Sequence, residues 1–202
     1  MKMSKINYWL FQVMVFCALL ANVNAQEQKQ KSRFSHQGIK ASIGSASFDM
    51  ISERGLAEGE GGMLSLGYGF SDRFSLWLTL LGSEHPEENV DSSITDFSGI
   101  ELNGQHRFET RSRWQPYAKV GVGLYGLESR GSNETLIGAG LNMGLGLDFF
   151  FGKHFGVGAE ASYKKIDYFS KSVQTESGEL IQELHPNLNG DTVGFMLTLT
   201  IQ

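Results

Sequence analysis

Residues 137–149 place an apolar side chain at every second position, with glycine, asparagine or aspartate at each position between them. Because successive side chains of a strand point to opposite faces, this pattern predicts a strand with one apolar face and one small or polar face. The alternation returns along the chain in segments of about ten residues, the length that a tilted strand needs to cross a bilayer. The pattern is that of a transmembrane β-barrel.

Eight segments carry the alternation, an even number, as in closed bacterial barrels. They are residues 35–48, 61–70, 74–82, 95–109, 114–127, 136–151, 154–168 and 190–202. The short connections between them are residues 71–73, 110–113 and 152–153, and the long, polar connections are residues 49–60, 83–94, 128–135 and 169–189. Short turns at one end and long loops at the other are typical of outer-membrane barrels, so we expect the short turns and both termini on the periplasmic side. The predicted fold class is all-β, an eight-stranded, antiparallel, up-and-down transmembrane β-barrel.

The N-terminal segment has the features of a cleavable signal peptide. Lys2 and Lys5 precede an apolar run over residues 8–21, which is shorter than the roughly 20 residues of a spanning helix. Small residues end the segment, and the predicted cleavage lies between Ala25 and Gln26. The predicted organisation is a signal peptide at 1–25, a polar N-terminal leader at 26–34 and one outer-membrane β-barrel domain at 35–202.

Composition narrows the classes of partner and cofactor. Without Lys2 and Lys5, 15 basic residues stand against 22 acidic ones, a net charge of −7 that speaks against nucleic acid as a partner. The single cysteine, Cys17, lies within the predicted signal, so we expect no disulfide and no cysteine metal site in the exported protein. The acidic residues in 83–93 have no regular ligand spacing, and neither a cofactor nor a metal ion is expected.

Aromatic residues flank all three short turns. The pairs are Phe70 and Phe74, Phe108 and Trp114, and Phe149 and Phe155. Aromatic residues close hairpins in any β-protein, so one pair alone means little. Three pairs at one level on the outer face predict an aromatic girdle at the periplasmic interface.

The face opposite the apolar one carries charges near the middle of its strands. Lys40, Glu101, Lys119 and Glu160 all point inward by parity. Buried charges are tolerated when they are paired and hydrogen-bonded, so these four residues predict an ion-pair layer that closes the narrow lumen. The alternative is a wet lumen in which water solvates the same charges.

Residues 115–124 read Q-P-Y-A-K-V-G-V-G-L, and with the Gly-rich strand at 137–149 they resemble the OmpA-like small outer-membrane barrels, including the opacity-protein-like group. The resemblance extends over nearly all of the chain that follows the predicted signal. It implies an eight-stranded barrel in the outer membrane of a Gram-negative bacterium. Members of this family usually end on an aromatic residue that the barrel-insertion machinery reads, whereas this chain ends on Gln202.

Two functions are weighed for such a barrel. The first is a structural or surface-interaction role through the long extracellular loops, and the second is a narrow, porin-like channel for ions or small solutes. The expected partners are outer-membrane lipid and lipopolysaccharide, the barrel-insertion machinery, and a surface ligand held by the loops. A soluble lipocalin-like binder would invert the two faces, and its G-x-W motif near the first strand is missing.

An enzyme is not expected. The family resemblance brings in lipid-modifying barrels, and Ser83 with His85 offers a nucleophile and a base close together in sequence. Nothing in the sequence places a third group or an oxyanion donor beside them.

Overall fold

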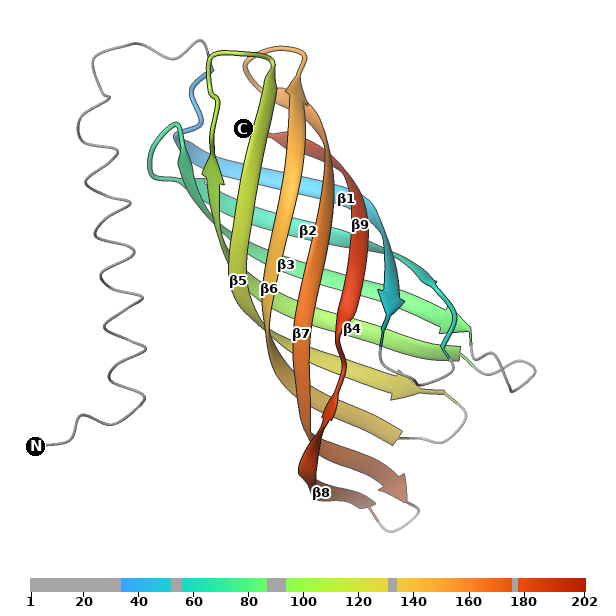
Figure 1. The fold of residues 1–202 in the computed structure, drawn as a ribbon. Helices are drawn as coiled ribbons and strands as arrows, with labels where there is room; N and C mark the ends of the chain where they lie inside the picture. Colours follow the sequence, from blue (N-terminus) through green and yellow to red (C-terminus); the bar gives the residue numbers. More distant parts are fainter. Residues whose placement is uncertain (1–33, 52–55, 87–93, 131–133, 176–177) are drawn as a thin grey trace, which may run out of the picture. The chain divides into compact units, whose positions relative to one another are not determined.

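The computed structural model describes residues 34–51, 56–86, 94–130, 134–175 and 178–202. The predicted signal peptide, its Ala25–Gln26 cleavage site and nearly all of the polar leader lie outside the described residues. The described strands are β1 (Gly38–Met50), β2 (Gly59–Gly69), β3 (Phe74–Pro86), β4 (Ile94–Arg107), β5 (Trp114–Ser129), β6 (Glu134–Phe150), β7 (Phe155–Thr175), β8 (Gly178–Asn189) and β9 (Thr192–Ile201) (Figure 1). The described residues contain no helix long and apolar enough to cross a membrane.

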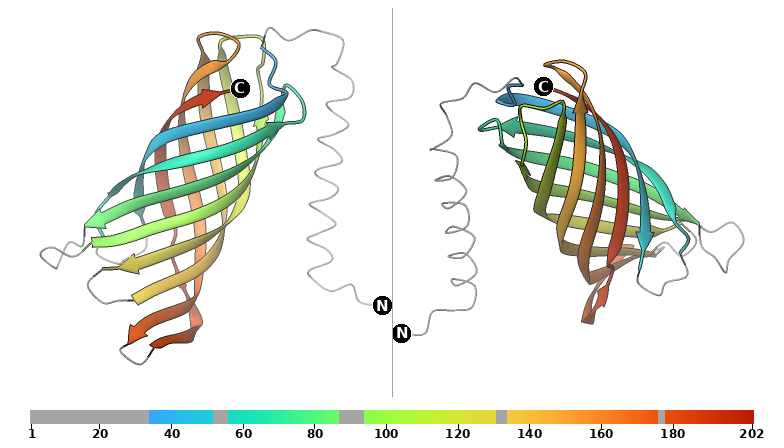
Figure 2. Two further views of the ribbon diagram at one scale, coloured as in Figure 1. Left: turned by 180° about the vertical axis from the view of Figure 1, so that it is seen from behind. Right: turned by 45° about the horizontal axis from the view of Figure 1, so that its top comes forward.

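Eight of these strands close into a barrel. Strands β1 to β7 pair antiparallel with their neighbours in chain order, and β9 lies between β7 and β1 (Figure 2). Strand β8 pairs only with the far end of β7 and stands outside the closed ring. The eight-stranded antiparallel barrel confirms the fold predicted from the sequence.

The strands are strongly staggered. A row of paired residues that starts at Lys40 on β1 returns to the same strand at Met50, ten residues further along. The row passes through Lys40, Gly67, Trp77, Asn103, Gly121, Asn142, Lys164, Thr192 and Met50. Such a stagger requires tilted strands, so residues paired in one row lie at different heights along the barrel axis.

The two faces of the wall differ as the alternation predicts. Apolar side chains such as Ile39, Leu66, Val120 and Leu145 are exposed on the outside. On the inside, many side chains are polar or charged and buried. An apolar exterior around a polar interior is the arrangement of a barrel in a membrane.

One long connection is folded rather than irregular. Residues 169–189, predicted as a loop, continue β7 to Thr175 and return as β8. Their side chains do not follow the apolar and polar alternation, because this hairpin extends past the closed ring and has no lipid face to cover. Strand β3 likewise continues to Pro86, past its predicted end at residue 82.

Candidate functional site

The four charges predicted as one layer are distributed over separate contacts in the lumen. Lys119 Nζ lies 2.5 Å from a carboxylate oxygen of Glu160. Glu101 pairs instead with Lys164, also at 2.5 Å. Lys40 donates to Ser75 Oγ at 2.8 Å and lies 6.0 Å from the ring centre of Trp77.

The stagger of the strands explains this distribution. Glu101 on β4 is paired with Gly123, four residues beyond Lys119 on β5, so the two side chains enter the lumen at different heights. Lys164 on β7 is fully buried, and its ammonium reaches Glu101 across the lumen. Residues near the middle of different strands therefore need not lie at the same height in the barrel.

Glycines on β6 make the contact between β5 and β7 possible. Lys119 is paired with Gly144 and Glu160 with Gly146, so the ion pair spans a strand that has no side chains there. A Cβ at Gly144 would lie 2.8 Å from Glu160 Oε1, and one at Gly146 would lie 2.2 Å from the ring of Tyr117. These positions require glycine because charged and aromatic groups from both neighbouring strands cover them.

A third buried ion pair, absent from the predicted layer, lies near the end with the short turns, predicted to be periplasmic and called the periplasmic end below. Arg107 at the end of β4 is 2.7 Å from Asp148 on β6, and both side chains are almost fully buried. Parity alone indicated that Asp148 faces inward, but Arg107 lies at the edge of its strand, where the alternation is least certain. The sequence signal that points to Arg107 is the alternation of β4, because Glu101, Asn103 and Gln105 face inward at every second position before it.

Neutral polar side chains complete the hydrogen bonding of the buried carboxylates. Tyr117 donates its hydroxyl to Glu160 at 2.8 Å. Glu101 accepts from Tyr125 at 3.0 Å and from the Asn103 amide at 3.1 Å. Glu160 and Glu101 thus each have both a cation and a neutral donor, as a buried charge requires.

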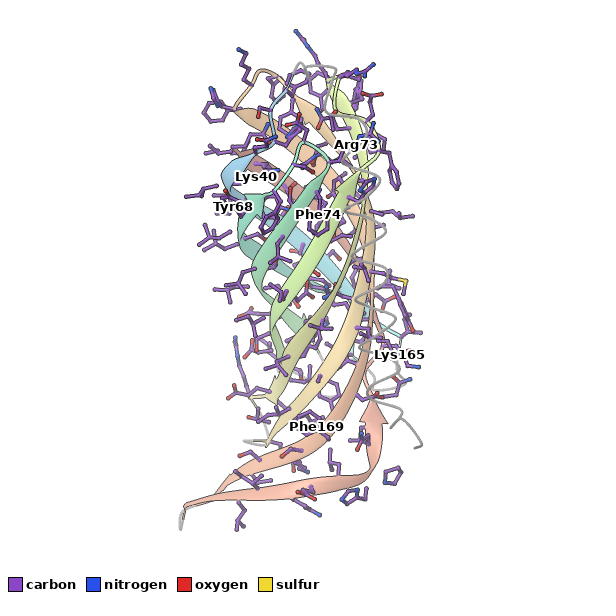
Figure 3. All side chains as sticks on the ribbon, turned by 90° about the vertical axis from the view of Figure 1, so that its left-hand side faces the viewer. Lys40, Tyr68, Arg73, Phe74, Lys165 and Phe169 are labelled. Atoms are coloured by element: carbon purple, nitrogen blue, oxygen red, sulfur yellow. The ribbon has the colours of Figure 1, made fainter. Side chains whose placement is uncertain are left out.

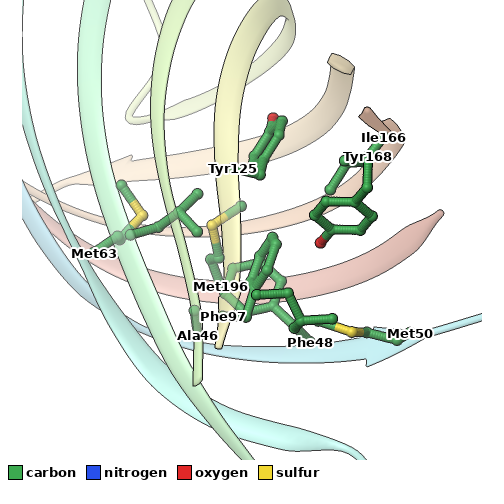
Figure 4. Packing of buried hydrophobic residues seen from close by; sticks show 11 residues of the cluster. Ala46, Phe48, Met50, Met63, Phe97, Tyr125, Ile166, Tyr168 and Met196 are labelled. Carbon is green, nitrogen blue, oxygen red and sulfur yellow. The ribbon is translucent and has the colours of Figure 1, made fainter. Parts of the chain in front are cut away.

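An apolar cluster fills the half of the lumen nearer the long loops, predicted to be extracellular and called the extracellular half below (Figure 4). Phe97 stacks on Tyr125 with ring centres 5.7 Å apart and meets Phe48 edge-on at the same distance. Ile166 and Tyr168 from β7 are completely buried in the same cluster. The periplasmic half is more polar and contains a cavity of about 20 Å³, lined by Arg107 among others, which is room for about one water molecule.

The residues before β1 pack into the periplasmic mouth. Phe34 and His36 are buried, and their rings lie 6.0 and 5.1 Å from the ring of Phe150. His36 Nδ1 is 2.6 Å from Oε1 of the last residue, Gln202, and the His36 backbone N–H donates to Asp72. We call Phe34 and His36, with this contact, the periplasmic stopper.

Burial, reinforced by the nearby Arg107 guanidinium, lowers the pKa of His36 to about 3. An unfolded histidine has a pKa near 6.5, so the unfolded state binds more protons between these two values. Stability from a neutral His36 is therefore fully present above pH 6.5 and is lost as the pH falls towards 3. This gives the stopper a testable signature in acid.

Lowering the pH from 7 to 4.5 is expected to cost the parent about 2 kcal/mol more unfolding free energy than it costs His36→Gln. Urea titration of protein refolded into phosphatidylcholine vesicles gives both values. His185→Gln, at a histidine that is 81% exposed, is the matched control and should follow the parent. If the parent and His36→Gln lose the same unfolding free energy in acid, neutral His36 does not stabilise the stopper.

The six residues of the predicted girdle lie around the short turns. The Phe70 and Phe74 rings are 6.1 Å apart and those of Trp114 and Phe149 are 4.6 Å apart. Phe70, Phe108, Trp114 and Phe155 are exposed, while Phe74 and Phe149 are half-buried. Their role as an interfacial girdle stays a prediction.

Ser83 and His85 lie on β3, and both side chains face the interior of the barrel. Ser83 Oγ is 2.9 Å from His85 Nε2, and His85 Nδ1 lies 3.1 Å from the backbone oxygen of Ala57. This is a nucleophile beside a base, with a backbone carbonyl orienting the ring. Both side chains are buried, and His85 also packs against Phe97, so the contact ties the strand ends into the apolar cluster.

The extracellular rim carries exposed ion pairs. Arg130, just after β5, lies 2.5 Å from Glu84 and 2.6 Å from Asp96. Hydrogen bonds from Arg130 to these carboxylates, that to Asp96 first, raise the pKa of the guanidinium. Such pairs are solvated and screened by salt, and they tie β3, β4 and β5 together above the membrane.

A closed antiparallel barrel with an apolar exterior and a charged, hydrogen-bonded interior defines a membrane barrel of the bacterial outer-membrane class. The family described as "Outer membrane protein beta-barrel domain" matches residues 15–200. The chain belongs to this family and is a bacterial outer-membrane protein. A sequence search of curated proteins finds no match.

Two solved barrels are similar in structure. Neisserial surface protein A is 15% identical, with a TM-score of 0.55 over 81% of this chain and 94% of that one. OprG from Pseudomonas aeruginosa is 16% identical, with a TM-score of 0.51 over 85% of this chain and 96% of that one. At this identity the similarity establishes the fold alone.

Proposed function

We propose that this protein is a closed outer-membrane barrel with a structural and surface-interaction role, carried by its extracellular hairpins. The observation that supports a closed barrel is the filled lumen. The ion pairs Lys119–Glu160, Lys164–Glu101 and Arg107–Asp148 occupy it, and the apolar cluster packs above them. A closed lumen leaves the extracellular side as the part of the barrel that meets other molecules.

The β7–β8 hairpin is the largest described element on that side. Leu180 and Ile181 are 64% and 72% exposed there, outside the closed ring. Large exposed apolar side chains on a protruding element are suited to contact with another molecule. The hairpin is therefore the proposed location of a surface ligand.

A narrow channel is the second candidate function. The polar periplasmic half of the lumen and its cavity near Arg107 favour it, because ions cross a membrane only along such a polar path. The two candidates differ in whether the paired charges and the apolar cluster stay in place at rest.

The proposed partners follow from location and surface. Outer-membrane lipid and lipopolysaccharide surround the apolar exterior, and the barrel-insertion machinery assembles the strands. Recognition by that machinery is proposed to rest on the apolar alternation of β9 through Leu197, Leu199 and Ile201.

The parent is expected to be silent in planar bilayer recordings. The double variant Glu101→Gln with Glu160→Gln leaves Lys164 and Lys119 without their carboxylates, so it should conduct small anions more readily than the parent. Glu84→Gln with Asp96→Asn, on the exposed rim, is the matched control and should stay silent. A parent that already conducts strongly would favour the channel over the closed barrel.

A further inference from the structure

A groove of about 720 Å³ runs along the outside of the barrel wall. Its floor contains the small residues Gly123, Ala139 and Gly140, and exposed leucine, isoleucine and valine side chains from β3 to β6 form its sides. These side chains face the lipid, so the groove opens on the lipid face of the barrel. Its lining also includes Glu101, whose carboxylate pairs with Lys164 in the lumen.

A lysine stands at one end of this groove. Lys165 on β7 lines it and points outward, because its neighbours Lys164 and Ile166 are buried inside the barrel. No carboxylate among the described residues lies within ion-pair distance of Lys165, whereas Lys119 and Lys164 each have one. A lysine on an apolar lipid face costs stability unless it reaches the polar interface.

The height of Lys165 in the barrel places it at the outer polar interface of the membrane. Lys165 lies ten residues along β7 from Phe155, which flanks a periplasmic turn. At a rise of about 3.3 Å per residue and a tilt of about 40°, this is about 25 Å, the height of the apolar band of such barrels. In Figure 3, Lys165 lies closer to Phe169, four residues further along β7, than to Tyr68 and Phe74, which lie near a short turn. The ammonium is thus at the level of the outer-leaflet headgroups.

We propose that this groove is a binding site for one anionic, phosphorylated lipid of the outer leaflet, with an acyl chain in the groove and the phosphate on Lys165. The apolar floor suits a chain, and the ammonium suits a phosphate. Asp167 faces outward two residues further from the membrane centre. It lies beyond the phosphate level, where it selects against a headgroup whose negative charge extends further outward.

The test uses a tryptophan reporter in the groove. Leu141→Trp places an indole beside Lys165, since Leu141 and Lys165 are directly paired. The protein is refolded into phosphatidylcholine vesicles that contain either brominated phosphatidic acid or brominated phosphatidylcholine, and quenching beyond that of the parent is measured. Ile43→Trp, on β1 three strands away from β6 around the ring, is the matched control on the lipid face.

At Leu141→Trp, phosphatidic acid is expected to bind about fivefold more strongly than phosphatidylcholine, which corresponds to about 1 kcal/mol for one lysine near the surface. The preference should be absent at Ile43→Trp and lost when Lys165→Gln is added, and Lys165→Arg should retain it. An equal preference at both reporters, or one that survives Lys165→Gln, would overturn the proposal. Both substituted lysine variants are first checked for the folded band on unheated gels, so loss of the barrel is distinguished from loss of the site.

Discussion

Replacing Glu101 by glutamine is expected to lower the free energy of unfolding by about 3 to 5 kcal/mol. The reason is that Lys164 would remain buried with its ammonium charge and no carboxylate, since Glu101 is its partner at 2.5 Å. The Tyr125 and Asn103 donors would also lose a charged acceptor. Reversible urea unfolding in phosphatidylcholine vesicles measures the change.

The matched control removes both charges. Glu101→Gln with Lys164→Met leaves no unpaired ion, so most of the lost stability should return. If the double variant is as unstable as Glu101→Gln, hydrogen bonding or packing at Glu101, and not the ion pair, determines the cost.

Placing an arginine on the lipid face should have a comparable effect. Val120→Arg is expected to cost about 2 to 4 kcal/mol, because Val120 is 57% exposed on the outer wall, where hydrocarbon replaces water. Ile181→Arg makes the same kind of change at a side chain that is 72% exposed on the β7–β8 hairpin, where water solvates the charge. It should cost less than about 0.5 kcal/mol.

The comparison depends on the surroundings alone, because both positions are exposed and both lose a β-branched apolar side chain. Unfolding titrations of the two variants under one condition give the answer. Equal costs, or a larger cost at Ile181, would mean that the wall around Val120 does not face lipid.

Parity makes the barrel predictable from sequence. When one face of an alternating strand must contact hydrocarbon, the other face must point into the barrel. The inward direction of Lys40, Glu101, Lys119 and Glu160 was therefore predictable from the sequence. Their partners were not. The ion-pair partner of a residue depends on the stagger of all eight strands. This stagger is set when the barrel closes and is not visible in the sequence of any single strand.

Residues outside the membrane were the least predictable. The β7–β8 hairpin has no lipid face, so its strands have no apolar alternation to detect. His36 was assigned to the first strand by its neighbours' pattern, yet it lies before β1 and packs into the barrel mouth. Its partner Gln202 is 166 residues away, a contact that only closure of the ring brings about.

The contact between His36 and Gln202 has a consequence for assembly. These residues flank the β1–β9 seam, the one junction of the ring that joins the two ends of the chain. The stopper therefore forms only when strands β1 and β9 have paired, so a formed stopper distinguishes a closed barrel from an open sheet. A tag fused after Gln202 would lie beside the stopper, whereas a tag inserted in the β7–β8 hairpin would not contact it.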